Sequence, residues 1–184
     1  MILFGLTGKS NSGKTTLLVQ LIPVLKGRGL SVSTIKHGHH VAELDTPGKD
    51  SDRHRVAGAH ETIFSTVNGY AITHSRAEDE PEPDLAALVA RLTPVDLVLV
   101  EGFKREPIPR IEVFRPDTGK AGLYPEDPSI LAVASNVPHG PGWPEVAPAH
   151  WLDMNDVEAV ADFIVQTVFP DRSATFGSSG LQQL

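Results

Sequence analysis

The chain has 184 residues, 40% of them hydrophobic and 21% charged, with no cysteine and a formal charge of −7 at neutral pH. This composition is typical of a globular protein and excludes a wholly disordered chain, a disulfide scaffold and thiol chemistry. The acidic balance argues against binding to nucleic acid or to a membrane surface, because both favour a basic face. No apolar run reaches the length of a membrane span and no signal peptide is evident, so we expect a cytoplasmic protein.

Strands and helices alternate along the first sixty residues. The apolar run Ile2–Thr7 stops at a glycine and predicts a buried strand. Apolar residues at helical spacing then predict a helix over Gly13–Arg28, which Pro23 should kink or split. A strand is expected over Leu30–Ile35 and, after a polar loop, a short helix over Asp50–Ala59.

A β-hairpin is predicted by Asn68-Gly69, which separates two β-rich runs, Glu61–Val67 and Tyr70–Thr73. Both runs are apolar and β-branched, and such a pair exposed to water would be an aggregation liability. We therefore expect the hairpin to be covered in a two-fold interface, which would make the protein a homodimer.

The second half of the chain predicts more strands and two helices, the first opening at Pro83 and the last at Asn155. The strands are expected over Val95–Val100, Ile111–Phe114 and Ile130–Ala134. Strands alternating with helices indicate an α/β fold, a mostly parallel sheet flanked by helices with the hairpin as an antiparallel addition. We expect one domain over residues 1–170 and a disordered tail over residues 171–184.

A phosphate-binding loop is indicated by Gly8–Thr15, which matches the pattern G-x-x-x-x-G-K-[ST] in full and lies between a predicted strand and a predicted helix. In such a loop the backbone N–H groups face phosphate oxygens, and the helix that follows adds its positive end. Lys14 would supply charge to the β- and γ-phosphates, and the Thr15 hydroxyl would bind Mg²⁺. The fold expected is therefore that of a P-loop NTPase. The residues expected to bind nucleotide here are Gly8, Asn11, Ser12, Gly13, Lys14, Thr15 and Thr16.

A P-loop protein also needs a carboxylate that orders Mg²⁺ or its water, at the carboxyl end of a neighbouring parallel strand. The strand Val95–Val100 offers Asp96 at its beginning and Glu101 at its end. Open α/β sheets bind ligands at the carboxyl ends of their strands. We therefore assign the metal-side role to Glu101, with a carboxylate that only caps the following loop as the alternative.

The polar segment after the second strand carries Lys36, His37, His39 and His40, followed by Asp45 and Asp50. In one interpretation this loop lies beside the nucleotide, with Lys36 near phosphate and Asp45 or Asp50 near Mg²⁺ or the attacking water. In a second, the histidines form a Ni²⁺ or Zn²⁺ site, although no standard zinc spacing is present. A loop that is merely solvated is the third.

Residues 103–120 carry an excess of two positive charges within an acidic chain. The basic residues are Lys104, Arg105, Arg110, Arg115 and Lys120, and the acidic ones are Glu106, Glu112 and Asp117. Such a stretch suits an anionic second substrate, such as a phosphorylated pterin, or another subunit, and a mixed surface is equally consistent with it.

Five blocks follow one another in the sequence: Gly8–Thr15, Lys36-His37-Gly38-His39-His40, Asp45-Thr46-Pro47-Gly48-Lys49-Asp50-Ser51, Val100-Glu101-Gly102-Phe103-Lys104 and Pro109-Arg110-Ile111-Glu112-Val113. Together they resemble the MobB family of molybdopterin-guanine dinucleotide biosynthesis proteins over about residues 1–135. The resemblance implies a GTP-binding P-loop protein, usually dimeric, with weak GTPase activity. Such a protein would support the MobA guanylyltransferase, which joins GMP to molybdopterin.

The resemblance also implies roles for particular residues. Phosphate-loop roles fall on Gly13, Lys14, Thr15 and Thr16, and the catalytic residues expected are Lys14, Asp45, Asp50 and Glu101. Similar nucleotide-binding folds read guanine after a late strand, which places Ser135 and Asn136 at the base, although no N-K-x-D pattern is present. The alternatives are a nickel or cobalt metallochaperone GTPase, an adapter whose nucleotide is structural, and a small-molecule kinase.

Overall fold

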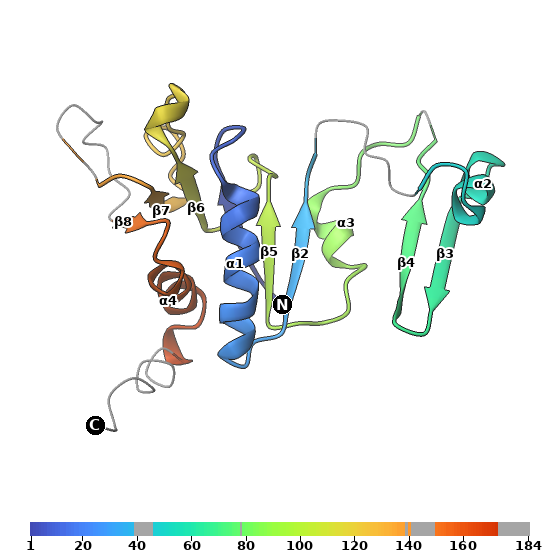
Figure 1. Ribbon diagram of the computed structural model, residues 1–184, viewed down its shortest axis with the longest axis horizontal. Helices are drawn as coiled ribbons and strands as arrows, with labels where there is room; N and C mark the ends of the chain where they lie inside the picture. Colours follow the sequence, from blue (N-terminus) through green and yellow to red (C-terminus); the bar gives the residue numbers. More distant parts are fainter. Residues whose placement is uncertain (39–45, 78, 139, 141–149, 173–184) are drawn as a thin grey trace. The chain divides into compact units, whose positions relative to one another are not determined.

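The computed structural model describes residues 1–38, 46–77, 79–138, 140 and 150–172. These residues fall into two compact units, one made of Met1–His37 with Leu85–Leu184 and the other of Gly38–Asp84 (Figure 1). The first unit holds the main sheet, and the second holds a hairpin and a short helix. The single domain expected over residues 1–170 stays a prediction, and nearly all of the expected tail lies outside the described residues.

The main sheet has six parallel strands in the order β2-β5-β1-β6-β7-β8 (Figure 1). The strands are β1 (Ile2–Thr7), β2 (Val32–Lys36), β5 (Leu97–Glu101), β6 (Arg110–Phe114), β7 (Ile130–Ser135) and β8 (His150–Asp153). The predicted α/β fold with a mostly parallel sheet is confirmed. We did not predict β8, because its four residues carry polar side chains at both ends and form no apolar run.

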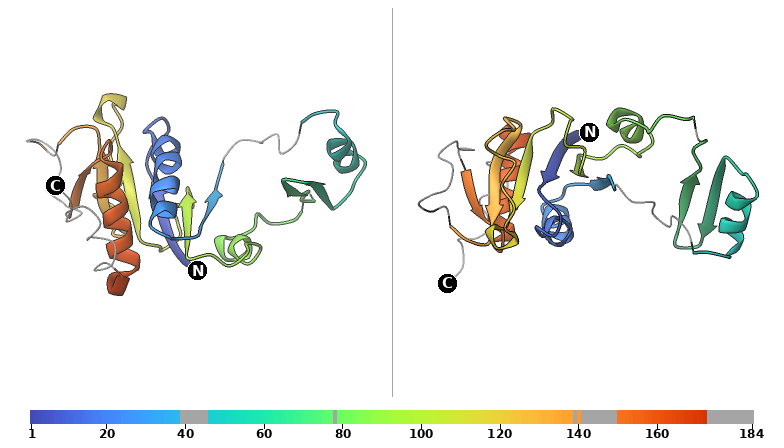
Figure 2. Two further views of the ribbon diagram at one scale, coloured as in Figure 1. Left: turned by 60° about the horizontal axis from the view of Figure 1, so that its bottom comes forward. Right: turned by 90° about the horizontal axis from the view of Figure 1, so that it is seen from above.

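Helices cover both faces of this sheet. One face packs against α1 (Lys14–Gly27) and α4 (Val157–Val168), which lie on the same side in Figure 2, and the other packs against α3 (Leu85–Val89). The central strand β5 shows why both covers are needed, since Leu97 and Leu99 face α1 and α4 while Val98 and Val100 face α3. Short 3₁₀ turns occur at Pro116–Thr118 and Pro170–Arg172.

Two details of the helices differ from the sequence-based expectation. Helix α1 runs on through Pro23, so the split does not occur there, and the kink stays a prediction. Helix α4 is capped by Asp156, whose carboxylate accepts from the backbone N–H of Ala159 at 3.0 Å, and not by Asn155. In the described part of the chain, none of the helices combines the length and the apolar character needed to cross a bilayer.

The second unit contains α2 (Asp50–Val56) and the antiparallel strands β3 (Glu61–Thr66) and β4 (Gly69–His74). The predicted hairpin is confirmed, but its turn lies one residue earlier than expected: Thr66 pairs with Gly69, so Val67-Asn68 form the turn and Gly69 begins β4. Its apolar side chains are exposed to solvent within this chain: Ile63 is 64% exposed and Phe64 57%.

Candidate functional site

The loop between β1 and α1 adopts a conformation that only glycine permits at its two ends. Gly8 has φ +140° and Gly13 φ +97°, both outside the range that other residues favour. A Cβ atom at Gly8 would lie 2.4 Å from the carbonyl oxygen of Val113 on β6. The first glycine of the motif is therefore required by the approach of β6 as well as by the turn.

Lys14 begins α1 with its ammonium group folded back over this loop. Its Nζ donates a hydrogen bond to the carbonyl oxygen of Lys9 at 2.8 Å. Burial lowers the pKa of Lys14, and the nearby carboxylate of Glu101 acts in the opposite direction. The charge is thus placed inside the loop, where the motif expects it.

Thr15, Lys36 and Glu101 lie together at the carboxyl edge of the sheet, although they come from three different elements. The Thr15 hydroxyl is 3.1 Å from both oxygens of the Glu101 carboxylate. The Lys36 Nζ is 3.7 Å from Glu101 Oε1 and donates to the Thr15 hydroxyl at 3.5 Å. A hydroxyl and a carboxylate are hard oxygen ligands of the kind that Mg²⁺ prefers.

Asp96, the other carboxylate considered for this role, precedes β5 at the opposite end of that strand. Its carboxylate accepts hydrogen bonds from the backbone N–H and the hydroxyl of Ser31, at 2.9 and 2.6 Å. It therefore ties the start of β5 to the segment before β2. Only Glu101 of the two lies beside the phosphate loop.

Close packing between the ends of β2 and β5 holds Glu101 in place. The N–H of His37 donates to the carbonyl oxygen of Glu101 at 2.8 Å. Gly102 has φ +97°, and a Cβ there would lie 2.9 Å from the Cβ of His37. The His37 ring packs against Phe103 with 5.0 Å between centroids, so this histidine has a packing role at the site's border.

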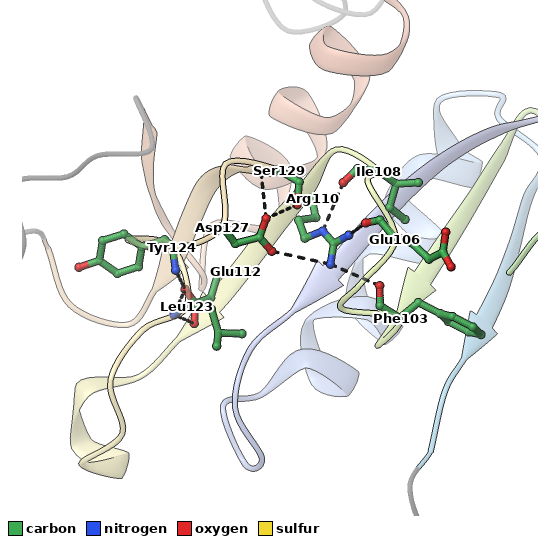
Figure 3. Close-up of polar contacts among 9 residues, drawn as sticks. All are labelled: Phe103, Glu106, Ile108, Arg110, Glu112, Leu123, Tyr124, Asp127 and Ser129. Atoms are coloured by element: carbon green, nitrogen blue, oxygen red, sulfur yellow. Dashed lines mark hydrogen bonds and ion pairs between the residues drawn. The ribbon is translucent and has the colours of Figure 1, made fainter. Parts of the chain in front are cut away.

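Arg110 is buried, which corrects the prediction that it belongs to a basic surface. Its side chain is 1% exposed and lies under the segment that crosses from β5 to β6 (Figure 3). The guanidinium donates to the carbonyl oxygens of Phe103, Glu106 and Ile108 and lies 4.0 Å from the Asp127 carboxylate. Arg110 thereby fixes the segment that directly follows Glu101.

Glu112 is also internal, with no exposed surface. Its carboxylate accepts from the backbone N–H groups of Leu123 and Tyr124 at 2.8 to 2.9 Å (Figure 3). Burial raises the pKa of Glu112, and the two backbone hydrogen bonds act against that shift. Both charges are buried because β6 is an inner strand of a parallel sheet that is covered on both faces.

The residues expected at the base lie at the end of β7. Ser135 is buried, its carbonyl oxygen accepts from Met154 N–H at 2.9 Å, and its hydroxyl accepts from Val137 N–H at 3.4 Å. Asn136 is exposed just beyond it. Since β7 is two strands from β1, this edge lies about 10 Å from the phosphate loop.

Two buried hydroxyls at the phosphate loop test whether the site fits an anion. Thr7 and Ser12 are each 2% exposed, and within the described residues neither hydroxyl oxygen has a hydrogen-bond partner. A buried hydroxyl left unpaired costs free energy that a bound acceptor would recover. The residues present therefore fit a phosphate group. The motif includes Ser12 but not Thr7, which sequence reasoning missed.

The remaining predicted residues are not part of this arrangement. Asp45, His39 and His40 lie outside the described residues. Asp50 begins α2 in the second unit, where its exposed carboxylate is 3.7 Å from Arg53. Across the described ranges, no three His, Asp or Glu side chains are grouped so as to hold a metal ion, and the His37/His39/His40 site stays a prediction.

Asp52 is a residue of the second unit that the sequence did not single out. Its carboxylate accepts from the backbone N–H of Gly48 at 2.8 Å and from Arg55. These two hydrogen bonds, with that of Gly48 the stronger influence, lower the pKa of Asp52. Asp52 thus fixes the turn that begins α2.

Comparisons with known proteins show the family of this chain. Residues 3–136 match the family model described as MobB, molybdopterin guanine dinucleotide synthesis protein B. Proteins named molybdopterin-guanine dinucleotide biosynthesis adapter protein are similar over most of their length. The one from Escherichia coli strain K12 is 45% identical over 85% of this chain and 87% of its own, and the one from Haemophilus influenzae is 43% identical over 88% and 86%.

A solved structure leads to the same family. The crystal structure of a molybdopterin-guanine biosynthesis protein B matches with a TM-score of 0.65 and 28% identity, over 90% of this chain and 99% of that one. The likeness covers the nucleotide-binding P-loop type of fold described above. The chain belongs to the MobB family of molybdopterin guanine dinucleotide synthesis proteins.

Proposed function

We propose that the chain binds GTP with Mg²⁺ at the phosphate loop and acts as an adapter in the synthesis of molybdopterin guanine dinucleotide. The observation that carries the proposal is the meeting of Thr15 and Glu101 beside the loop, with a buried, unpaired Ser12 hydroxyl inside it as far as the structure describes. This set offers donors for phosphate and oxygen ligands for a divalent ion within one compact unit.

Each residue of the site has a separate task in this proposal. Lys14 exchanges the carbonyl oxygen of Lys9 for phosphate oxygens, and the helix that it begins supplies its positive end. Thr15 and Glu101 hold the Mg²⁺, which neutralises phosphate charge when bound. Lys36 balances the charge of Glu101 and adds a further cation near the phosphates.

Slow hydrolysis of GTP is expected from such a site. Lys14 and Mg²⁺ would stabilise charge in the transition state. An arginine finger commonly contributes about 10³- to 10⁵-fold in rate. Arg110 cannot serve as an arginine finger, because its guanidinium is buried under the segment between β5 and β6. In this proposal turnover is slow and the nucleotide acts chiefly as a bound ligand.

The partner we propose is the MobA guanylyltransferase, with molybdopterin as the compound that passes between the two proteins. The relatives' printed name, adapter, supports a protein that acts through a partner. Exposed apolar side chains of the hairpin support a homodimer. Ile63 and Ile72 lie opposite each other on one face and Phe64 lies on the other, and an apolar strand pair left in water is a liability unless it is covered.

Calorimetric titration of Mg-GTP into the Lys14→Ala variant tests the nucleotide site. We expect binding to be lost while the circular dichroism spectrum stays that of the wild-type protein, because the Lys14 ammonium is partly exposed and its hydrogen bond is to the carbonyl oxygen of a loop residue, Lys9. Lys26→Ala is the matched control, since it removes the same charge about 18 Å further along α1. Undiminished GTP affinity in Lys14→Ala would refute the site.

Co-purification with the guanylyltransferase tests the adapter role. The wild-type protein should be retained on the immobilised transferase, and Lys14→Ala should be retained less well if the nucleotide-bound form is the one that docks. Absence of retention with and without GTP would contradict the proposed partnership.

A further inference from the structure

A cation reaches the phosphate loop from a part of the chain that neither the motif nor the shared sequence blocks include. Lys120 lies between β6 and β7, and its Nζ donates to the carbonyl oxygen of Ser10 at 3.1 Å. Ser10 occupies the middle of the phosphate loop. Both residues belong to the first unit, so the contact is made within one compact body.

The segment that carries Lys120 is fixed on both sides. Before it, the Thr118 hydroxyl closes the 3₁₀ turn by donating to the carbonyl oxygen of Arg115 at 2.7 Å. The N–H of Gly119 donates to the carbonyl oxygen of Pro116 at 2.9 Å. After it, the buried Glu112 carboxylate holds the N–H groups of Leu123 and Tyr124. Lys120 is therefore an exposed residue whose neighbouring backbone is held by hydrogen bonds on both sides, so its side chain reaches the loop by a change of rotamer alone.

Lys14 is surrounded by more lysine ammonium groups than carboxylates. The ammonium groups of Lys36, Lys104 and Lys120 all act to lower the pKa of Lys14, and the one carboxylate that opposes them is Glu101. Like charges gathered at one place repel one another, and a bound anion relieves that repulsion. The excess positive charge fits a polyphosphate chain.

The bond from Lys120 to Ser10 adds little to the stability of the fold. Ser10 is exposed, so water can serve its carbonyl oxygen when the lysine is removed. An ammonium group has three donors, and one on the Ser10 carbonyl leaves two for another acceptor. The contact therefore keeps the Lys120 ammonium at the loop and leaves donors for phosphate oxygens.

We propose that Lys120 is a phosphate-binding residue of the nucleotide site. Like Lys14 at the start of α1, it would donate to phosphate oxygens, but it reaches the loop from the segment between β6 and β7. This inference rests on the proposed function, because it assigns one more residue to the same site. It predicts that Lys120 recognises the polyphosphate chain and contributes nothing to the choice of base.

Titration of inorganic tripolyphosphate and of Mg-GTP into Lys120→Ala and Lys120→Arg tests the proposal. We expect both ligands to bind Lys120→Ala about tenfold more weakly than the wild-type protein, the usual scale of a partly exposed charge-assisted hydrogen bond. Lys120→Arg should restore most of the affinity, and titration of guanosine should be the same in all variants. Lys26→Ala controls for the loss of one positive charge.

The outcomes separate this inference from the proposed function. Wild-type affinity of Lys120→Ala for both ligands, or a loss no larger than in Lys26→Ala, would overturn the role of Lys120 and leave the GTP site standing. A wild-type protein that binds tripolyphosphate but no GTP would refute the nucleotide assignment, and the loss of tripolyphosphate affinity in Lys120→Ala would still support the phosphate contact.

Discussion

The two units of this chain differ in how far the apolar side chains of their strands are buried. In the first unit, β5 is buried on both faces and every apolar residue of the strand is hidden. In the second, the hairpin leaves Ile63, Phe64 and Ile72 more than half exposed. The strand β5 thus has its apolar side chains covered within its own unit, whereas the hairpin has the exposed apolar surface on which the proposed dimer rests.

The contrast is only partial for charged groups, because Asp52 of the second unit also holds a backbone N–H group, that of Gly48. Inside the first unit, the buried Arg110 and Glu112 are paired with backbone carbonyl and amide groups that they hold in place. In the second unit, Asp50 and Arg53 form an exposed pair at 3.7 Å, of a kind that contributes little. We therefore expect substitutions in the first unit to change folding and nucleotide binding, and those on the hairpin to change assembly.

The largest expected effect is that of Arg110→Met. Removing the guanidinium takes its donors from the carbonyl oxygens of Phe103, Glu106 and Ile108, of which the first two keep a backbone N–H donor, and leaves the Asp127 carboxylate without its cation. The change should cost about 3 kcal/mol in the free energy of unfolding. Urea denaturation measures it. Arg105→Met, an exposed change in the same stretch, is the control and should cost less than about 0.5 kcal/mol. Equal stability of the two variants would contradict the buried role.

Glu101→Gln should weaken the dependence of GTP affinity on Mg²⁺. The amide keeps the size of the side chain but offers the ion a neutral ligand, so we expect the Mg²⁺-stimulated affinity to fall about thirtyfold. Titrations with Mg²⁺ and with EDTA give the ratio. Asp96→Asn is the matched control, because Asp96 binds Ser31 at the other end of β5. A loss in the control equal to that in Glu101→Gln would show that the wrong carboxylate was assigned.

Ile63→Asp should break the proposed dimer without unfolding the first unit. A charge on the exposed face of the hairpin opposes burial of that face, so the dissociation constant measured by sedimentation equilibrium should rise about tenfold or more. Val19→Asp on α1 changes an equally exposed valine and should leave assembly as it was. A wild-type protein that sediments as a monomer at micromolar concentration would contradict the dimer itself.

The smallest effect concerns pH. Burial raises the pKa of Glu112 in the folded protein above its ordinary value of 4.5, so folding favours the protonated form. The stability that this group contributes is present in full below pH 4.5 and is lost as pH rises through the folded pKa. Compared with Glu112→Gln, the wild-type protein should therefore lose stability over that range. If the wild-type protein instead gained unfolding free energy relative to Glu112→Gln as pH rose, the upward shift of the Glu112 pKa would be wrong.

Sequence patterns predicted most of the first unit because its elements are local and strongly periodic. β1 lies at the predicted Ile2–Thr7, and the phosphate loop stands between a strand and a helix as expected. The sequence could not show that Arg110 and Glu112 are buried, because that depends on which strands flank β6. Nor could it reveal Lys120, whose contact with Ser10 joins residues 110 positions apart.

The most direct test of the account is calorimetric titration of GTP, GDP and ATP into the wild-type protein with Mg²⁺. The account predicts binding of GTP and GDP and no heat from ATP, with the GTP signal reduced when Mg²⁺ is chelated. Equal or tighter binding of ATP would contradict the guanine assignment and favour a small-molecule kinase at the same loop, and no binding of any of the three would contradict the nucleotide site.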